Sequence, residues 1–437
     1  MSGAAQSFVS SPVAGVAGDI RVPGDKSISH RAAMLGAIAQ GTTEIQGFLE
    51  GEDCRATLAA LVAMGVGIER LAPGQLRVHG VGLRGLKAPG RALDLGNSGT
   101  SMRLLAGILA GQAFDSELVG DASLMRRPME RVAAPLRLMG AGIRTRDGLP
   151  PLSIEGGCLL RGCEHALEIP SAQVKSALLL AGLYAAGPTC VSEPGVSRDH
   201  TEHMLEAFGV TVARSGSSAS IAGPATLAAT RIDVPGDFSS AAFFLVAGLV
   251  AGSAPLRIRD VGVNPTRTAL IDILRLMGAD IRLHEVTAQA GEPRADIEVR
   301  PCTLRGIVVP AVLVPIALDE LPILFAAAAV AEGDTVVTGA AELRVKESDR
   351  LAAMADGLEA IGVAVERLAD GLLIRGGPVT GGVVTSRGDH RVAMSFAVLG
   401  ARARSPIAIR DVQNVATSFP GFAETARAAG LRLEEAG

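Results

Sequence analysis

One short pattern recurs six times along the chain, at intervals of 68 to 84 residues. Each copy is an apolar, helix-like stretch, then a glycine, then a short strand-like stretch. A glycine after the last apolar turn predicts a helix C-terminus, because glycine takes the left-handed backbone conformation without steric cost. The six glycines are Gly65, Gly140, Gly209, Gly278, Gly362 and Gly430. The pattern therefore predicts an α/β protein of six similar units, with a period too long for a solenoid.

A second repetition divides the six units into two groups of three. Residues 22–27 read Val-Pro-Gly-Asp-Lys-Ser, and residues 234–239 read Val-Pro-Gly-Asp-Phe-Ser. Phe238 stands where Lys26 stands in the first copy, which indicates a duplicated framework in which one copy kept the chemistry. The alternative is six ordinary αβ units in one large sheet.

The repetition favours two domains, each containing three units. The predicted domains are residues 22–235, and residues 1–21 together with 236–437. The chain would then cross between them near 22–24 and 234–236. Two adjacent crossings form a hinge, and hinged domains usually close on a ligand.

Composition restricts the class of protein. The 437 residues are 48% hydrophobic and carry a net charge of −4, which provides no field that would attract nucleic acid or a membrane surface. The longest apolar runs, such as 241–252 and 321–331, are too short to span a bilayer and predict buried helices. No basic segment precedes an apolar stretch at the amino terminus, so no signal peptide is predicted. The five cysteines form no CxxC pair, which favours reduced thiols in the cytoplasm.

Lysine is rare in this chain, and three of its four lysines lie inside polar motifs. The lysines are Lys26, Lys87, Lys175 and Lys346, against 37 arginines. Arginine cannot replace lysine where a compact or titratable ammonium is required. The surviving lysines therefore indicate functional positions.

Two glycine-opened segments precede apolar helices and are candidate anion sites. Residues 22–31 contain lysine, serine and arginine after a Pro-Gly turn, and residues 96–103 read Gly-Asn-Ser-Gly-Thr-Ser-Met-Arg. Backbone N–H groups at a helix N-terminus favour anions. A simple helix cap explains one residue of 96–103 but not its two glycines and Arg103. The segment is not a Walker A loop, since no Gly-Lys-Ser/Thr ending follows.

Further polar segments are less specific when taken singly. An arginine pair at 126–127 is usually a solvated face, residues 171–175 present hydroxyl, amide and ammonium donors, and His200 is more typical of a surface or hydrogen-bonded histidine than of a catalyst. Carboxylates come late in the chain, at 319–320 and in the charged run 344–350. That run alone predicts an exposed helix with ion pairs.

Taken together and in this order, these segments resemble EPSP synthase, the 3-phosphoshikimate 1-carboxyvinyltransferase family, over residues 18–422. Residues 24–26, 171–175, 198–202 and 264–267 are similar to the class II bacterial branch, which includes glyphosate-tolerant members. The resemblance implies the two-domain enolpyruvyl transferase fold, an α/β fold in which each domain has three βαβαββ repeats and the domains are hinged.

The resemblance also implies a reaction. Phosphoenolpyruvate gives its carboxyvinyl group to the 5-hydroxyl of shikimate 3-phosphate, by addition and elimination through a tetrahedral intermediate. Phosphate and 5-enolpyruvylshikimate 3-phosphate are released, on the route to chorismate and the aromatic amino acids. We expect no metal and no organic cofactor, glyphosate as an inhibitor, no nucleic-acid or membrane partner, and a monomer.

By match to the family, cations and donors from both halves hold the two substrates, and planar arginine forks suit carboxylate and phosphate. The expected phosphoenolpyruvate ligands are Lys26, Gly99, Arg127, Gln173, Arg350 and Arg391. The expected shikimate 3-phosphate ligands are Lys26, Ser27, Arg31, Ser171, Ala172, Gln173, Arg198, Asp319 and Lys346. Supporting residues of the cradle are Asn97, Thr100 and Arg103.

Carboxylates in so anionic a site repel the ligands unless they move protons, which singles out Asp319 and Glu347. We expect Asp319 to accept the proton of the 5-hydroxyl. Glu347 with Lys26 would deliver a proton to the methylene carbon and later remove one. His390 orients either Glu347 or the phosphate, and the sequence leaves both open. Because the acids and Lys26 would titrate together, individual protons are not assigned.

Two departures from the family pattern stand out. Thr417 occupies a position that is lysine in many members, so one cation around phosphoenolpyruvate is missing. Gly99 stands where some tolerant members have alanine, which leaves glyphosate tolerance open.

Two alternatives differ in what they require. UDP-N-acetylglucosamine carboxyvinyltransferase has Lys-Asn where this chain has Lys26-Ser27, and carries a functional cysteine in a glycine-rich loop that none of the cysteines here occupies. A non-catalytic phosphometabolite-binding protein would have no use for Asp319 and Glu347.

Overall fold

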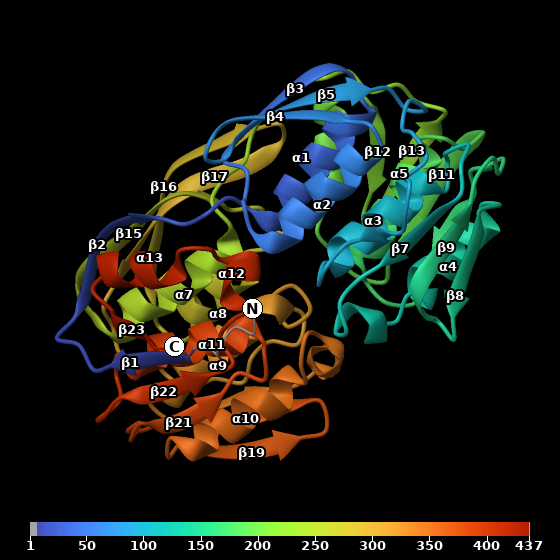
Figure 1. Cartoon of the computed structure of the whole chain (residues 1–437). Coiled ribbons are helices and arrows are strands. Elements are labelled where there is room, and N and C mark those ends of the chain that lie inside the picture. The colour runs from blue at the N-terminus through green and yellow to red at the C-terminus, as the bar shows by residue number, and fades with distance from the viewer. Residues whose placement is uncertain (1–6, 437) are drawn as a thin grey trace. The chain divides into compact units, whose positions relative to one another are not determined.

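The structure is a computed structural model that describes residues 7–436. The chain divides into two compact units, which we describe separately (Figure 1). Unit I comprises Gly24–Val234 and Ala288–Glu292. Unit II comprises the described residues 7–23, 235–287 and 293–436. The chain therefore passes from one unit to the other after Pro23 and after Val234, and again on either side of 288–292.

Unit I contains three sheets with helices between their strands (Figure 1). Its helices are α1 (Lys26–Ile38), α2 (Glu52–Ala63), α3 (Gly99–Leu109), the 3₁₀ turn η1 (Leu124–Arg126), α4 (Glu130–Leu138), α5 (Ala172–Gly182) and α6 (His200–Ala207). Its strands are β3 (Gln40–Gln46), β4 (Gly67–Ala72), β5 (Gln75–Val81), β6 (Leu93–Asp94), β7 (Ser116–Val119), β8 (Gly142–Arg146), β9 (Leu149–Glu155), β10 (Glu164–Ala166), β11 (Gly187–Ser192), β12 (Val212–Ser215), β13 (Ser218–Gly223) and β14 (Arg231–Asp233).

Unit II has the same kind of organisation. Its helices are α7 (Phe238–Val250), α8 (Ala269–Leu276), the 3₁₀ turn η2 (Leu318–Glu320), α9 (Leu321–Ala329), the 3₁₀ turn η3 (Ala341–Val345), α10 (Arg350–Ala360), α11 (His390–Gly400), α12 (Val415–Ser418) and α13 (Phe422–Ala428). Its strands are β1 (Ser7–Ser11), β2 (Val16–Arg21), β15 (Gly252–Gly262), β16 (Asp280–Gln289), β17 (Glu292–Arg300), β18 (Asp334–Val337), β19 (Ala364–Leu368), β20 (Gly371–Arg375), β21 (Gly382–Thr385), β22 (Ile407–Arg410) and β23 (Arg432–Ala436). The tips of β16 and β17 reach into the segment assigned to unit I.

The sheets repeat one pairing pattern. In β14-β3-β5-β4 the first pair is parallel and the next two pairs are antiparallel, and the sheets β6-β7-β9-β8, β10-β11-β13-β12 and β21-β22-β1-β23 pair in the same way. The sheet β16-β17-β15-β2 has its parallel pair between β15 and β2. Beside β18-β20-β19 the segment before η2 forms two isolated parallel bridges, Arg305 with Glu332 and Val308 with Val336, in place of a fourth strand. The predicted α/β fold of similar units is confirmed.

The six predicted glycines end six helices. Each lies two positions after the last residue of α2, α4, α6, α8, α10 or α13, and each has a positive φ between 85° and 99°. A left-handed residue there closes the helix end and turns the chain into the strand that follows. The expected backbone conformation is confirmed at all six positions.

Buried helices form the centre of each unit. In unit I, α3 and α5 approach so closely that a Cβ on Gly107 would lie 2.2 Å from the carbonyl oxygen of Ala177. In unit II, α7 is buried along almost its entire length, including Phe238. A helix that is apolar on all sides belongs in a core. None of the helices in the described residues is long and apolar enough to cross a membrane.

The two Val-Pro-Gly-Asp segments build the same local structure. Asp25 caps α1 by accepting the N–H of Ile28, and Asp237 caps α7 by accepting the N–H of Ser240. Both helices have 13 residues. The repeated Val-Pro-Gly-Asp motif therefore forms the same turn and the same helix start in both copies.

Candidate active site

Three buried helices of unit I begin at predicted site residues. Lys26, Gly99 and Ala172 are the first residues of α1, α3 and α5. The residue before each helix caps it with a side-chain oxygen, and these caps are Asp25, Ser98 and Ser171. Helix N-termini with exposed donors favour anions, so this side of unit I suits a phosphate or a carboxylate.

Lys26 is held at the start of α1 by a carboxylate. Its Nζ lies 3.1 Å from Asp53 Oδ2, and 22% of its side-chain surface remains exposed. Ser27 follows it and is half-buried. The ammonium is thus anchored while still accessible to a ligand.

Arg31 is buried and its donors are fixed by neighbouring elements. It donates to the carbonyl oxygen of Ser27 at 2.9 Å, to Thr201 Oγ1 at 2.7 Å and to Ser176 Oγ at 2.7 Å. Burial lowers the pKa of Arg31 to about 10, which still leaves it charged at neutral pH. The half-buried Arg198 lies close enough to act on that charge.

The glycine-rich segment brings two arginines together. Arg127 donates to Asn97 Oδ1 at 2.6 Å, and Asn97 Nδ2 donates to Asp121 Oδ2 at 2.7 Å. A Cβ placed on Gly99 would lie 3.0 Å from a guanidinium nitrogen of Arg127 and 3.0 Å from one of Arg103. The absent side chain at Gly99 therefore leaves space beside both cations.

Gln173 links the start of α5 to the start of α3. Its Oε1 accepts from Arg103 at 2.5 Å, and its Nε2 donates to Thr100 Oγ1 at 2.9 Å. Arg103 also donates to the carbonyl oxygen of Pro128. These bonds orient the predicted supporting residues.

Lys175, expected to present an ammonium donor, is instead used inside unit I. It is buried, and its Nζ lies 2.9 Å from both Glu193 and Glu202. Although burial disfavours the ammonium, these carboxylates outweigh it and raise the pKa of Lys175. Lys175 therefore holds α5 to its neighbours, and the nearby His200 is a buried hydrogen-bonded histidine, 2.7 Å from Glu292.

In unit II, Arg350 gathers three carboxylates. This arginine, 1% exposed, donates to Asp389 at 2.8 Å, to Glu347 at 2.6 Å and to Asp319 at 3.4 Å. Although burial favours the neutral form, the carboxylates raise its pKa. The charged run 344–350, expected in isolation as an exposed helix, is instead the end of η3, four non-helical residues at 346–349 and the buried Arg350 that starts α10.

The remaining predicted residues of unit II lie around the same acid. Lys346 Nζ is 3.5 Å from Asp319 Oδ1, and Arg391 donates to the carbonyl oxygen of Asp319 at 2.8 Å. His390 and Arg391 are the first two residues of α11, which Asp389 caps. Asp319, Lys346, Glu347, Arg350 and Arg391 thus form one connected cluster.

Sequence reasoning missed the residues that hold these side chains in place. They are Asp53 and Thr201 in unit I, and Ser239, Glu320 and Asp389 in unit II. Ser239 had a signal, because it repeats Ser27 in the second Val-Pro-Gly-Asp segment. We expected only the first copy to keep chemistry, yet Ser239 contacts Arg391.

Thr417, at the position expected to be lysine in many family members, adds no charge to unit II. Thr417 is buried in α12 and donates to the carbonyl oxygen of Asn414 at 2.6 Å. The Thr417 hydroxyl therefore stabilises the start of its own short helix.

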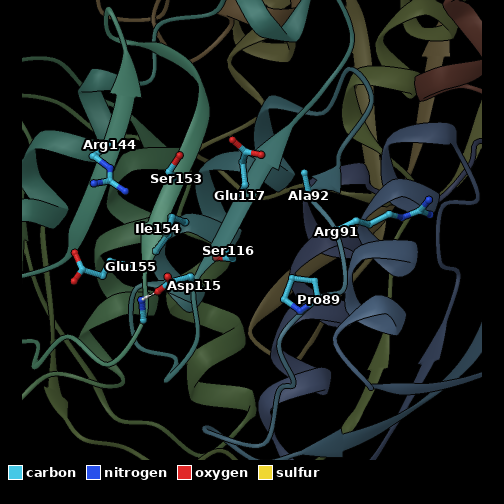
Figure 2. Close-up of a pocket in the computed structure, with 11 residues that line it drawn as sticks. Pro89, Arg91, Ala92, Asp115, Ser116, Glu117, Arg144, Ser153, Ile154 and Glu155 are labelled. Carbon is cyan, nitrogen blue, oxygen red and sulfur yellow. Dashed lines mark hydrogen bonds between the residues drawn. The ribbon is translucent and has the colours of Figure 1, made fainter.

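A pocket of about 580 Å³ lies elsewhere in unit I and contains none of the predicted site residues (Figure 2). It is lined by Arg91 and Arg144 but also by the carboxylates of Asp115, Glu117 and Glu155. Acids that outnumber the cations disfavour dianionic ligands, so we place the candidate site at the two clusters above. Within residues 7–436, no group of three or more His, Cys, Asp and Glu could hold a metal ion.

Comparison with known proteins gives a consistent result. The sequence model of a family described as EPSP synthase (3-phosphoshikimate 1-carboxyvinyltransferase) matches residues 11–426. A 3-phosphoshikimate 1-carboxyvinyltransferase of Methylococcus capsulatus is 59% identical over 98% of both chains. Another from Nitrosococcus oceani is 56% identical over 98% of this chain and 96% of its own. A solved EPSP synthase from Acinetobacter baumannii superposes with a TM-score of 0.90 at 52% identity, covering 99% of this chain and 100% of its own.

Proposed function

The chain belongs to the EPSP synthase (3-phosphoshikimate 1-carboxyvinyltransferase) family, and we propose that it transfers the carboxyvinyl group of phosphoenolpyruvate to the 5-hydroxyl of shikimate 3-phosphate. The products are phosphate and 5-enolpyruvylshikimate 3-phosphate. The observation that carries the proposal is the pair of acids on one buried cation, since Asp319 and Glu347 both contact Arg350. Cations alone would only bind these anionic substrates, whereas transfer also requires groups that move protons.

The cluster of unit II explains how binding can prepare the proton donor. Arg350 pairs with Asp319 and Glu347, and Arg391 pairs with Asp319. An incoming phosphoenolpyruvate competes for these donors and adds negative charge beside Glu347. Both effects favour the protonated form of a carboxyl group. Glu347 would then act as the acid that protonates the methylene carbon.

The addition step then balances as follows. The methylene carbon of phosphoenolpyruvate gains a proton, the 5-hydroxyl oxygen bonds to its C2, and Asp319 accepts the hydroxyl proton. In the elimination step, the methyl group loses a proton and the bond between C2 and the phosphate oxygen breaks. Lys26 and Glu347 share the proton transfers at carbon, and His390 orients Glu347 or the phosphate.

The binding roles follow the charges of the two substrates. For phosphoenolpyruvate we propose Lys26, Gly99, Arg127, Gln173, Arg350 and Arg391. For shikimate 3-phosphate we propose Lys26, Ser27, Arg31, Ser171, Ala172, Gln173, Arg198, Asp319 and Lys346. Asn97, Thr100 and Arg103 support the cradle through the hydrogen bonds described above.

We further propose that both units act on the same pair of substrates. The units would close about the chain crossings after Pro23 and Val234, near residues 22–24 and 234–236. Closure would exclude water from the reacting atoms. The sequence segments 24–26, 171–175, 198–202 and 264–267 support assignment to the class II bacterial branch. We propose a monomer that is inhibited by glyphosate in competition with phosphoenolpyruvate.

The test is release of inorganic phosphate by the purified protein. Phosphate should appear only when phosphoenolpyruvate and shikimate 3-phosphate are both present, together with a product of the expected mass. Replacing shikimate 3-phosphate with UDP-N-acetylglucosamine should give no release. Two results would refute the assignment. One is phosphate release from phosphoenolpyruvate with UDP-N-acetylglucosamine but not with shikimate 3-phosphate, and the other is binding of both proposed substrates without phosphate release.

A further inference from the structure

Beneath Arg391 lies a buried group of side chains that sequence analysis did not connect. Ser239 Oγ donates to Glu320 Oε1 at 2.5 Å and accepts from Arg267 at 2.6 Å and from Arg391 at 3.2 Å. Ser239, Arg267 and Glu320 are all at most 6% exposed. These residues come from α7, the loop before α8, and η2.

The direction of each bond is fixed by chemistry. Guanidinium groups only donate, so both arginines must use the lone pairs of the Ser239 oxygen. Its single proton is then left for the Glu320 carboxylate, which only accepts when ionised. Ser239 therefore uses its full hydrogen-bonding capacity and has one orientation. A hub of this kind is rigid, because turning the hydroxyl breaks all three bonds.

Electrostatics assign different roles to the two arginines. Glu320 Oε1 lies 3.8 Å from a guanidinium nitrogen of Arg267 and 3.5 Å from one of Arg391. One Glu320 carboxylate thus faces two cations, and Arg391 also lies 4.0 Å from Asp319 Oδ2. Arg267 is 3% exposed at its side chain and Arg391 is 11% exposed, so Arg391 is the cation that a ligand can reach.

The same group also reaches the proposed base. Arg391 donates to the backbone carbonyl oxygen of Asp319 at 2.8 Å, and Glu320 is the next residue along η2. Fixing Glu320 therefore fixes the turn that carries Asp319. One buried network sets the place of a substrate-binding cation and of an acid.

We propose that Ser239 and Glu320, with Arg267, are positioning residues that hold Arg391 for phosphoenolpyruvate. The inference rests on the proposed function, since it assigns Arg391 to that substrate. The residues touch no substrate themselves. Their effect must therefore appear in the affinity for phosphoenolpyruvate more than in that for shikimate 3-phosphate.

The experiment compares phosphate release by the full-length protein and its variants Ser239→Ala, Glu320→Gln and the double variant. Each single change should raise the KM for phosphoenolpyruvate by about tenfold, the factor for a lost hydrogen bond to a charged group. The KM for shikimate 3-phosphate should rise by clearly less, because Asp319 is the one proposed shikimate ligand that the described contacts of the network reach, and they reach it through its backbone carbonyl. The double variant should be little worse than Glu320→Gln, since both changes break the same hub.

Matched controls separate positioning from general stability. Ser10→Ala removes another buried hydroxyl of unit II, one that donates to the carbonyl oxygen of Ala397. Asp296→Asn removes a buried acid that pairs with Arg257 and Arg259. Both should lower Tm without changing the ratio of the two KM values.

The outcomes separate the two proposals. An inactive wild-type protein would refute the proposed function. An active wild type whose Ser239→Ala variant keeps its KM for phosphoenolpyruvate, or shifts both KM values equally, would overturn the positioning role alone. If Glu320→Gln does not fold, Ser239→Ala still decides, because it leaves no charge unpaired.

Discussion

At the scale of single residues, Glu347 lets proton transfer be separated from binding. Glu347→Gln keeps an oxygen that can accept from Arg350, which now lies 2.6 Å from the carboxylate. We expect kcat to fall by about 10²–10⁴, the usual contribution of a proton-transfer group, with much smaller changes in KM. Single-turnover rates measured by rapid quench check this. Glu359→Gln, on the exposed end of the same helix, is the control, and equal rates for Glu347→Gln and wild type would remove the role.

Lys26 tests whether the site needs an ammonium rather than a positive charge alone. Lys26→Arg keeps the charge but enlarges the group next to Asp53 and removes a group that can titrate. We expect a fall in kcat of at least about 10², in the range of other proton-transfer groups. The exposed Lys87 gives the matched control, since Lys87→Arg should leave steady-state kinetics unchanged. Wild-type turnover in Lys26→Arg would contradict the argument from lysine scarcity.

Gly99 tests the space beside the two arginines of unit I. In Gly99→Ala the new methyl group would lie 3.0 Å from nitrogens of Arg103 and Arg127, so the guanidinium groups must shift. We expect the KM for phosphoenolpyruvate and the Ki for glyphosate each to rise by about tenfold, the cost of modest overpacking. Inhibition measured at several phosphoenolpyruvate concentrations gives both constants. An unchanged Ki would place glyphosate away from this helix start.

At the scale of elements, the two Asp caps should contribute equally to the free energy of unfolding. Asp25→Ala and Asp237→Ala each remove the side-chain acceptor at the start of a 13-residue helix. Each should lower stability by about 1 kcal/mol, the usual cost of losing such a cap. Denaturant unfolding followed by circular dichroism measures the loss. The double variant should show the sum, since the caps belong to different units.

The elements also show why some predictions succeeded and others could not. The six glycines and the buried runs were readable because local backbone sterics and apolar character decide them. Asp389 could not be predicted as a partner of Arg350, because the two residues are 39 positions apart and only folding brings them together. The burial of Lys175 could not be predicted for the same reason. Only folding places its ammonium beside Glu193 and Glu202, whereas the sequence alone presents it as a donor.

At the scale of the whole molecule, the proposed closure has a solution signature. Shikimate 3-phosphate with glyphosate should bring the units together and reduce the radius of gyration in small-angle X-ray scattering. Glyphosate alone should produce no change, because the ligands proposed for shikimate 3-phosphate come from both units. Identical scattering with and without both ligands would exclude closure as the response to binding.

The whole molecule also shows what the repeat does and does not specify. Six similar units could be foreseen from the glycine pattern, and the sheets repeat one order of parallel and antiparallel pairs. The assignment of Ala288–Glu292 to unit I could not, because it depends on contacts such as Gln289 with Asp233 and Glu292 with His200. Periodicity predicts the architecture, whereas long-range side-chain contacts determine where a strand tip docks.

The glycines that end six helices limit how this chain can diverge. At each of them any other residue would force a left-handed backbone on a Cβ, at a cost of about 1–2 kcal/mol. Domains are usually stable by only about 5–15 kcal/mol, and losses at distant sites add. Four such replacements would together cost about 4–8 kcal/mol, a large part of that stability. The left-handed backbone at these six positions therefore restricts which residues can replace glycine, whatever the space around each one.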